Sequence, residues 1–185
     1  MRRKRQNTFS KVMLISCLGI FFECGPARQQ HAAESPPTVV RHVDLDRYLG
    51  KWYEIARYPN RFQKGCVAST AVYSLHEDGS IHVLNECRKG SLKGPIRRAE
   101  GKAWVVDKDT QAKLKVQFFW PFRGDYWIID LGRNYEYAVV GHPKRKYLWI
   151  LSRTPEMKTE VYQSILEGIV RNGYDPGRLI RTVSQ

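Results

Sequence analysis

The sequence predicts an all-β domain, an eight-stranded antiparallel up-and-down β-barrel with a C-terminal α-helix packed outside it. Short runs of β-branched and aromatic residues recur between turn residues, and the clearest of them alternates apolar with polar side chains. One later run has helical periodicity instead. A chain of 185 residues with 42% hydrophobic content is long enough to bury one core of this kind.

Eight strands are expected, joined by short connections. Two of them form a hairpin around the turn at residues 76–79, where Asp78-Gly79 favours a tight reversal. Within residues 112–119, apolar and polar side chains alternate, so one face of the sheet is wet. A sheet of this kind removes its exposed edges by closing into a barrel, whose interior holds side chains or one small ligand. The other expected strands are 51–58, 101–106, 126–131, 135–141 and 147–152.

The helix is expected directly after the eighth strand. Thr154 provides an N-cap and Pro155 a first-turn proline, and Asn172-Gly173 ends the helix. Apolar residues recur every four positions between these limits, which indicates a helix lying on the outside of the barrel. They are Met157, Val161, Ile165 and Ile169. The tail, residues 178–183, could return as a ninth strand.

The N-terminus has the organisation of an export signal. Basic residues precede an apolar segment, residues 12–22, that is too short to span a bilayer, so residues 1–27 are expected to be a signal peptide. Leu14-Ile15-Ser16-Cys17 has the form of a bacterial lipobox, which would make Cys17 a lipid anchor, whereas Gly25-Pro26-Ala27 offers ordinary cleavage after Ala27. Both interpretations remain open.

Residues 28–37 are then a linker and residues 38–185 the folded domain. An exported chain with a lipobox would be an outer membrane lipoprotein facing the periplasm. Without the anchor it would be a soluble periplasmic protein.

The formal net charge of +13 suggests nucleic acid at first sight. Several of these charges lie in residues 2–11, within the predicted signal peptide, and the rest are scattered through strands and turns. They form no basic helix or aromatic-spaced stripe, so we expect no nucleic-acid partner. A basic surface still favours anionic partners such as the headgroups of a membrane surface.

Cys66 and Cys87 are the only cysteines within the predicted domain. They lie about equally far from the turn at 76–79 and have the parity that puts them on one face of neighbouring strands. In an exported protein this favours a disulfide, worth about 3 kcal/mol in the chain-entropy model. Two free thiols remain the alternative. Neither cysteine has a CxxC partner, so no metal site is expected.

Catalytic signatures such as GxSxG or HExxH are absent from the sequence. Glu54 and Glu100 could fall inside the barrel, where desolvation would raise the pKa of each, but position alone does not make a catalytic pair. The aromatic content of 12% is the more informative feature. In "YLWIL", Tyr147 and Trp149 are in register with Arg153 and are expected to point into an apolar pocket.

Three motifs resemble those of the lipocalins. Gly50-Lys51-Trp52 is similar to their G-x-W motif in the first strand, and Arg153, just before the helix, is similar to their third motif. At the second motif, T-D-Y in many members, Asn134-Tyr135-Glu136 keeps the tyrosine and departs elsewhere. The motifs occur in the family's order over residues 42–183, and the chain looks most like the bacterial outer-membrane lipocalins and apolipoprotein D.

The resemblance implies a cup-shaped barrel, or calyx, closed at one end where Trp52 packs against Arg153 near Gly50. It also implies an apolar or amphipathic ligand, with fatty acids and lysophospholipids the leading class, and no cofactor. Tyr73 and Trp149 match positions that line the pocket in near relatives. The remaining pocket residues are expected from alternation and register: Val83, Trp104, Leu114, Val116, Phe118 and Tyr147.

Three functional hypotheses follow. The first, and the one we favour, is a non-enzymatic lipid carrier of the cell envelope. The second is an isomerase-like enzyme that works inside the calyx with a free Cys66 or Cys87 as nucleophile. The third is a structural module whose barrel is filled by its own aromatic residues and whose surface binds a partner or forms a homodimer.

Overall fold

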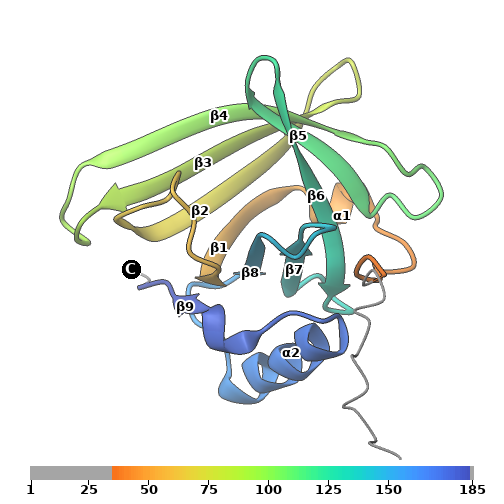
Figure 1. Cartoon of the computed structure of the whole chain (residues 1–185). Helices are drawn as coiled ribbons and strands as arrows, with labels where there is room; N and C mark the ends of the chain where they lie inside the picture. The colour runs from red at the N-terminus through yellow and green to blue at the C-terminus, as the bar shows by residue number, and fades with distance from the viewer. Residues whose placement is uncertain (1–34, 184–185) are drawn as a thin grey trace, which may run out of the picture. The chain divides into compact units, whose positions relative to one another are not determined.

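Antiparallel strands close on themselves into a barrel (Figure 1). The computed structural model describes residues 35–183. Strands β2 to β8 follow one another along the sheet, and β1 pairs with both β8 and β2, which closes the barrel and confirms the predicted fold. The strands are β1 (Gly50–Arg57), β2 (Cys66–Leu75), β3 (Ile81–Lys89), β4 (Ile96–Val105), β5 (Lys113–Phe119), β6 (Phe122–Leu131), β7 (Tyr137–Gly141), β8 (Leu148–Ser152) and β9 (Ile180–Arg181).

Strand β1 is divided between two partners. Its first half, from Gly50 to Tyr53, pairs with β2, and its second half is not paired with that neighbour. There β9 pairs with β1 instead, and the backbone N–H of Ala68 in β2 donates to the carbonyl of Val183 at 2.7 Å. The C-terminal tail therefore fills the wall between β1 and β2, as a ninth strand.

The connections alternate between the two ends of the barrel. At the closed end lie the β2–β3, β4–β5 and β6–β7 connections together with a short helix, α1 (Leu45–Tyr48), which the sequence analysis did not anticipate. At the other end, the mouth, lie the β1–β2, β3–β4, β5–β6 and β7–β8 connections. Contacts join them there: Gly90 N donates to Gly65 O at 2.8 Å, and the rings of Phe62 and Tyr147 are 5.6 Å apart.

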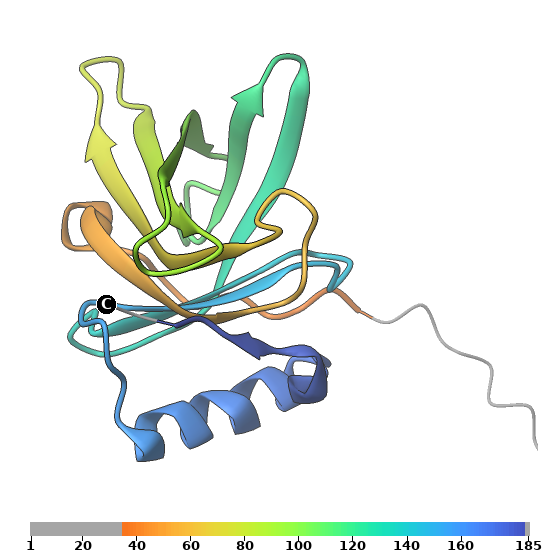
Figure 2. The same ribbon diagram turned by 90° about the vertical axis from the view of Figure 1, so that its left-hand side faces the viewer.

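Helix α2 (Thr159–Arg171) covers the outside of the barrel (Figure 2). Its buried residues Ile165 and Ile169 pack in a second apolar cluster with side chains from β1, β6, β7 and β8. The helix ends at Asn172-Gly173 as predicted, and Gly173 has a φ of +77°. It begins at Thr159 rather than at Pro155, because residues 153–158 first carry the chain from the end of β8 onto the outer face.

A bilayer-spanning helix is not found among residues 35–183, where none is long and apolar enough. The predicted signal peptide, Cys17 and most of the predicted linker lie outside the described residues.

A disulfide joins Cys66 of β2 to Cys87 of β3, with 5.5 Å between their Cα atoms. It is the bridge that the hairpin parity predicted. It crosslinks neighbouring strands close to the mouth, because Cys66 begins β2 and the β3–β4 connection follows shortly after Cys87.

Replacing both cysteines with alanine should lower the free energy of unfolding by about 3 kcal/mol, because the unfolded chain regains the entropy that the crosslink removes. Urea denaturation under oxidising conditions measures the difference. Wild type unfolded in the presence of a thiol reductant should match the double variant. A double variant as stable as the oxidised wild type would contradict the bridge.

Candidate functional site

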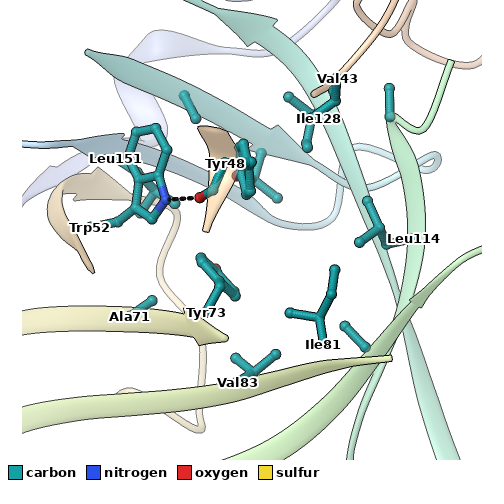
Figure 3. Close-up of a cluster of buried hydrophobic side chains, with 14 of the residues drawn as sticks. Val43, Tyr48, Trp52, Ala71, Tyr73, Ile81, Val83, Leu114, Ile128 and Leu151 are labelled. Carbon is teal, nitrogen blue, oxygen red and sulfur yellow. Dashed lines mark hydrogen bonds between the residues drawn. The ribbon is translucent and has the colours of Figure 1, made fainter. Parts of the chain in front are cut away.

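The interior of the barrel is lined by apolar side chains that converge from several strands (Figure 3). Tyr73, Val83 and Leu114 are buried there at 8%, 3% and 3% exposure, and in Figure 3 they point toward one another. Val116 and Phe118 pack against the same cluster and are partly exposed. These five predicted pocket residues therefore all face the interior.

Along β4 and β5 the exposure of the inward side chains rises from the closed end to the mouth. Along β4 the inward positions run from Ala103, which is buried, through Ala99, which is partly exposed, to Arg97, which is exposed. Along β5 they run from the buried Leu114 to the partly exposed Phe118. On these two strands the inward side chains are therefore shielded from solvent near the closed end and accessible to it near the mouth.

Trp104 lies on the outer face of the barrel, contrary to the prediction. It pairs with Lys115 across the β4–β5 ladder, and the guanidinium of Arg123 lies 5.1 Å from the centre of its ring. Its neighbours Ala103 and Val105 take the inward positions. Strand β4 shows no clear alternation, and a phase error of one residue exchanges the two faces of a strand.

Tyr147 and Trp149 lie at the rim of the mouth. The Trp149 ring is 5.8 Å from Tyr147 and 6.3 Å from Phe62, and its Nε1 donates to Gln63 Oε1 at 2.9 Å. Phe62 and Gln63 belong to the β1–β2 connection. These contacts tie β8 to that connection, so the two predicted aromatic residues border the entrance rather than the deep interior.

Three tyrosine hydroxyls meet near the closed end. The Tyr126 hydroxyl lies 2.7 Å from that of Tyr48 and 3.0 Å from that of Tyr73. Burial raises the pKa of all three, that of Tyr73 to about 12, so the phenols stay neutral. Each hydroxyl has one proton to donate, and the two hydrogen bonds among the three hydroxyls use two of these protons. One O–H group is therefore left to donate to a polar group inside the barrel. Of these three tyrosines only Tyr73 was predicted to line the pocket, and Tyr48 lies on the unanticipated α1.

Gly50, Trp52 and Arg153 meet at the closed end. The guanidinium carbon of Arg153 lies 3.7 Å from the centre of the Trp52 ring, and Trp52 is fully buried. Arg153 Nη1 donates to the carbonyls of Leu49 and Lys51, and Nη2 donates to those of two α1 residues, Arg47 and Tyr48. Gly50 has a φ of +90°, a conformation that favours glycine.

Tyr135, the tyrosine kept in the second motif, also belongs to the closed end. Its hydroxyl accepts from Asp44 N at 2.8 Å, and the Arg47 guanidinium lies 4.2 Å from the centre of its ring. Its carbonyl accepts from Arg153 Nε at 3.3 Å. The second and third motifs are therefore parts of one structure that holds α1 in place.

Glu54 is a buried carboxylate of the barrel wall, 4% exposed. It accepts hydrogen bonds from Gln63 Nε2 at 2.6 Å and from the Thr182 hydroxyl, and it lies 3.4 Å from Arg57 Nε. Burial raises its pKa, while the Thr182 hydroxyl and Arg57 oppose that shift. Glu100, the other carboxylate expected inside, lies on the outside and is 3.5 Å from His82. The two therefore form no catalytic pair.

A protein-family model described as a lipocalin-like domain matches residues 43–184. The chain is a lipocalin. It is 45% identical to the outer membrane lipoprotein Blc of Escherichia coli (strain K12) over 80% of this chain and 85% of that protein. It is 44% identical to temperature-induced lipocalin-1 of Arabidopsis thaliana over 78% and 81% of the two chains, and 33% identical to mouse apolipoprotein D over 92% and 93%.

Solved structures show the same fold at lower identity. Insecticyanin of the tobacco hornworm Manduca sexta aligns with this lipocalin over 82% of this chain and 85% of its own, with a TM-score of 0.65 and 18% identity. The cockroach allergen Per a 4 aligns over 80% and 92%, with a TM-score of 0.63 and 19% identity. At these identities the likeness concerns the fold alone.

Replacing Arg153 with alanine should lower the free energy of unfolding of this lipocalin by at least about 2 kcal/mol, because the cation–π contact and several hydrogen bonds to backbone carbonyls are lost together. Urea denaturation measures the change. Arg153→Lys should fall between wild type and alanine, since lysine keeps the charge without the planar fork. Arg133→Ala, at an exposed position of the same end, is the matched control and should be neutral. Equal effects at 133 and 153 would contradict this role.

Glu54→Gln should change how stability depends on pH. Because burial raises the pKa of Glu54, the folded protein binds the carboxyl proton more tightly than the unfolded chain does. The stability that this protonation contributes is fully present at low pH. It is lost as pH rises through the raised pKa. From about pH 4 to pH 8 the glutamine variant should therefore gain stability relative to wild type.

Urea denaturation of the Glu54 variant at a series of pH values tests this. Glu100→Gln, whose side chain is 68% exposed, is the control for the loss of one carboxylate from the outer surface. A difference between wild type and Glu54→Gln that stays constant with pH, or changes in the opposite direction, would refute the proposed cause.

Proposed function

We propose that this lipocalin binds, stores or transports a fatty acid or lysophospholipid in its calyx and so serves membrane maintenance in the cell envelope. The main support is the change in side-chain exposure along the interior. It rises from the buried Leu114 and Val83 to the partly exposed Phe118 and the exposed Arg97. Such a site suits a ligand with an apolar tail and a polar head. The tail lies toward the closed end and the head stays at the mouth.

The energetics favour a single-chain lipid. Each buried methylene contributes about 0.8 kcal/mol, so an acyl chain supplies micromolar affinity even after the ordering costs are subtracted. The rim aromatic residues Tyr147 and Trp149 suit the upper part of the chain. Arg97, facing inward near the mouth, suits an anionic carboxylate or phosphate.

The envelope location is supported by the relatives. Several bacterial proteins at 43 to 45% identity are outer membrane lipoproteins by name. In our proposal residues 1–27 direct export, and Cys17 either carries a lipid anchor on the outer membrane or is removed with the signal peptide. The intact mass of the mature protein distinguishes the two, because diacylation adds a fixed mass to a chain that begins at Cys17.

The enzyme hypothesis is weakened by the disulfide. Its nucleophile would have been a free Cys66 or Cys87, and both sulfurs are bonded to each other. The structural-module hypothesis predicts a filled barrel, whereas the inward side chains of β4 and β5 nearest the mouth are partly exposed or exposed. Both observations favour a carrier, in keeping with a family whose members are in general binding and transport proteins.

Phe118→Ala and Trp149→Ala should each weaken binding of a fluorescent fatty acid by roughly tenfold, because each removes about 1 to 2 kcal/mol of apolar contact with the chain. Trp104→Ala is the matched control, since this partly buried aromatic residue lies on the outside of the same barrel. Fluorescence titration gives the affinities, and denaturation confirms that each variant is folded. Organic extraction and mass spectrometry identify any copurified lipid. Wild-type protein that takes up no fatty acid and copurifies with none would refute the carrier function.

A further inference from the structure

The two ends of the barrel carry opposite charge. The mouth connections, residues 58–65, 90–95, 120–121 and 142–147, contain no acidic residue. Their basic residues are Arg61, Lys64, Lys93, Lys144, Arg145 and Lys146. The connections of the closed end, residues 76–80, 106–112 and 132–136, are acidic on balance. Their charged residues are Glu77, Asp78, Asp107, Lys108, Asp109, Arg133 and Glu136. The mouth therefore attracts an anionic surface and the closed end does not.

The exposed aromatic side chains gather at the same end. Phe119, Trp120 and Phe122 surround the β5–β6 turn at 76%, 86% and 77% exposure, and Phe62 of the β1–β2 connection is 48% exposed. Among residues 35–183, every other Phe, Trp and Tyr side chain is buried or only partly exposed. In Figure 2 the tip of the β5–β6 hairpin, in teal, stands clear of the other elements and points away from α2.

The described chain also begins at the mouth. Ser35 O accepts from Arg145 Nη2 of the β7–β8 connection at 2.8 Å. From there the segment runs toward the closed end, where Val43 N donates to Thr110 O of the β4–β5 connection at 2.8 Å. The described part of the chain therefore begins on the side of the mouth.

We propose that the mouth of the barrel docks on an anionic phospholipid surface, with Phe119, Trp120 and Phe122 inserted at the headgroup level. Aromatic side chains favour this depth, and the surrounding lysines and arginines face the lipid phosphates. The proposal rests on the proposed carrier function, for which it supplies the route of exchange, since the mouth would open directly onto the lipids.

A membrane fits this surface better than a second copy of the chain. Two mouths brought together would oppose their basic connections without an acidic partner at that end. The apolar tip is also narrow and projecting, which suits insertion between headgroups more than a flat contact between two proteins.

Sedimentation with vesicles tests the docking, with every protein beginning at Arg28, after the predicted signal peptide, so that neither its apolar segment nor an acyl anchor at Cys17 contributes. Vesicles of phosphatidylethanolamine and phosphatidylglycerol should bind the protein, and binding should weaken as salt rises. The triple variant F119S/W120S/F122S should bind at least about tenfold more weakly. The control variant L75S/V106S replaces exposed apolar residues of the closed end and should bind as wild type does.

Two further measurements separate the explanations. K93Q/K144Q/K146Q should lose affinity for the anionic vesicles but not for pure phosphatidylcholine. Fatty acid binding in the absence of vesicles should be unchanged in the aromatic variant. Should all proteins fail to bind fatty acid while vesicle binding still depends on the aromatic residues, the docking stands and the carrier function fails.

Two outcomes would overturn the docking. In the first, F119S/W120S/F122S binds vesicles as tightly as wild type. In the second, sedimentation equilibrium shows that this variant converts a dimer to a monomer with no change in vesicle binding, which would make the tip an interface between two copies.

Discussion

The stacking of the Arg153 guanidinium on Trp52 is the interaction on which the closed end depends. Helix α1 ends beneath the barrel with carbonyls that have no partner within so short a helix, and unpaired carbonyls at an apolar interior are costly. Arg153 donates to those of Arg47 and Tyr48, and Trp52 Nε1 also donates to Tyr48. Arg153, which follows the last barrel strand β8, thus caps helix α1 and also covers the indole of Trp52. The cap keeps Tyr48 inside, where its hydroxyl joins that of Tyr126.

This closure explains why the interior is graded. With water excluded at one end, inward positions near it can be apolar and fully buried, as Val83 and Leu114 are. The opposite end has no such cap, so its inward positions are partly wet and include the charged Arg97. The buried Glu54 marks the boundary on one side, because Gln63 and Thr182 must satisfy its carboxylate within the wall. A barrel that is closed at one end and accessible at the other follows from this single seal.

The sequence predicted what repeats and missed what depends on a single contact. Regular strands, the helix end at Gly173 and the Cys66–Cys87 pairing follow from turn residues and parity, which are local. Trp104 could not be placed, because β4 has no clear alternation and no neighbouring residue fixes its phase. Helix α1 is too short to have a periodicity, so the role of Tyr48 was invisible. The site was therefore predictable along regular strands and unpredictable where a connection folds back into the barrel.

The charged residues also show why the fold was needed, because their total number is known from the sequence and their positions in space are not. A chain of +13 suggests nucleic acid when only the total is considered, and a scattered basic surface when the sequence is followed residue by residue. The antiparallel topology changes that interpretation, because it sorts alternate connections to opposite ends. Residues distant in sequence, such as Arg61, Lys93 and Lys144, come to one end, and Asp78 and Asp107 come to the other. The resulting polarity lies along the barrel axis and coincides with the wet end of the interior. An electric field of this direction would orient the protein with its opening toward a negative surface before any contact forms.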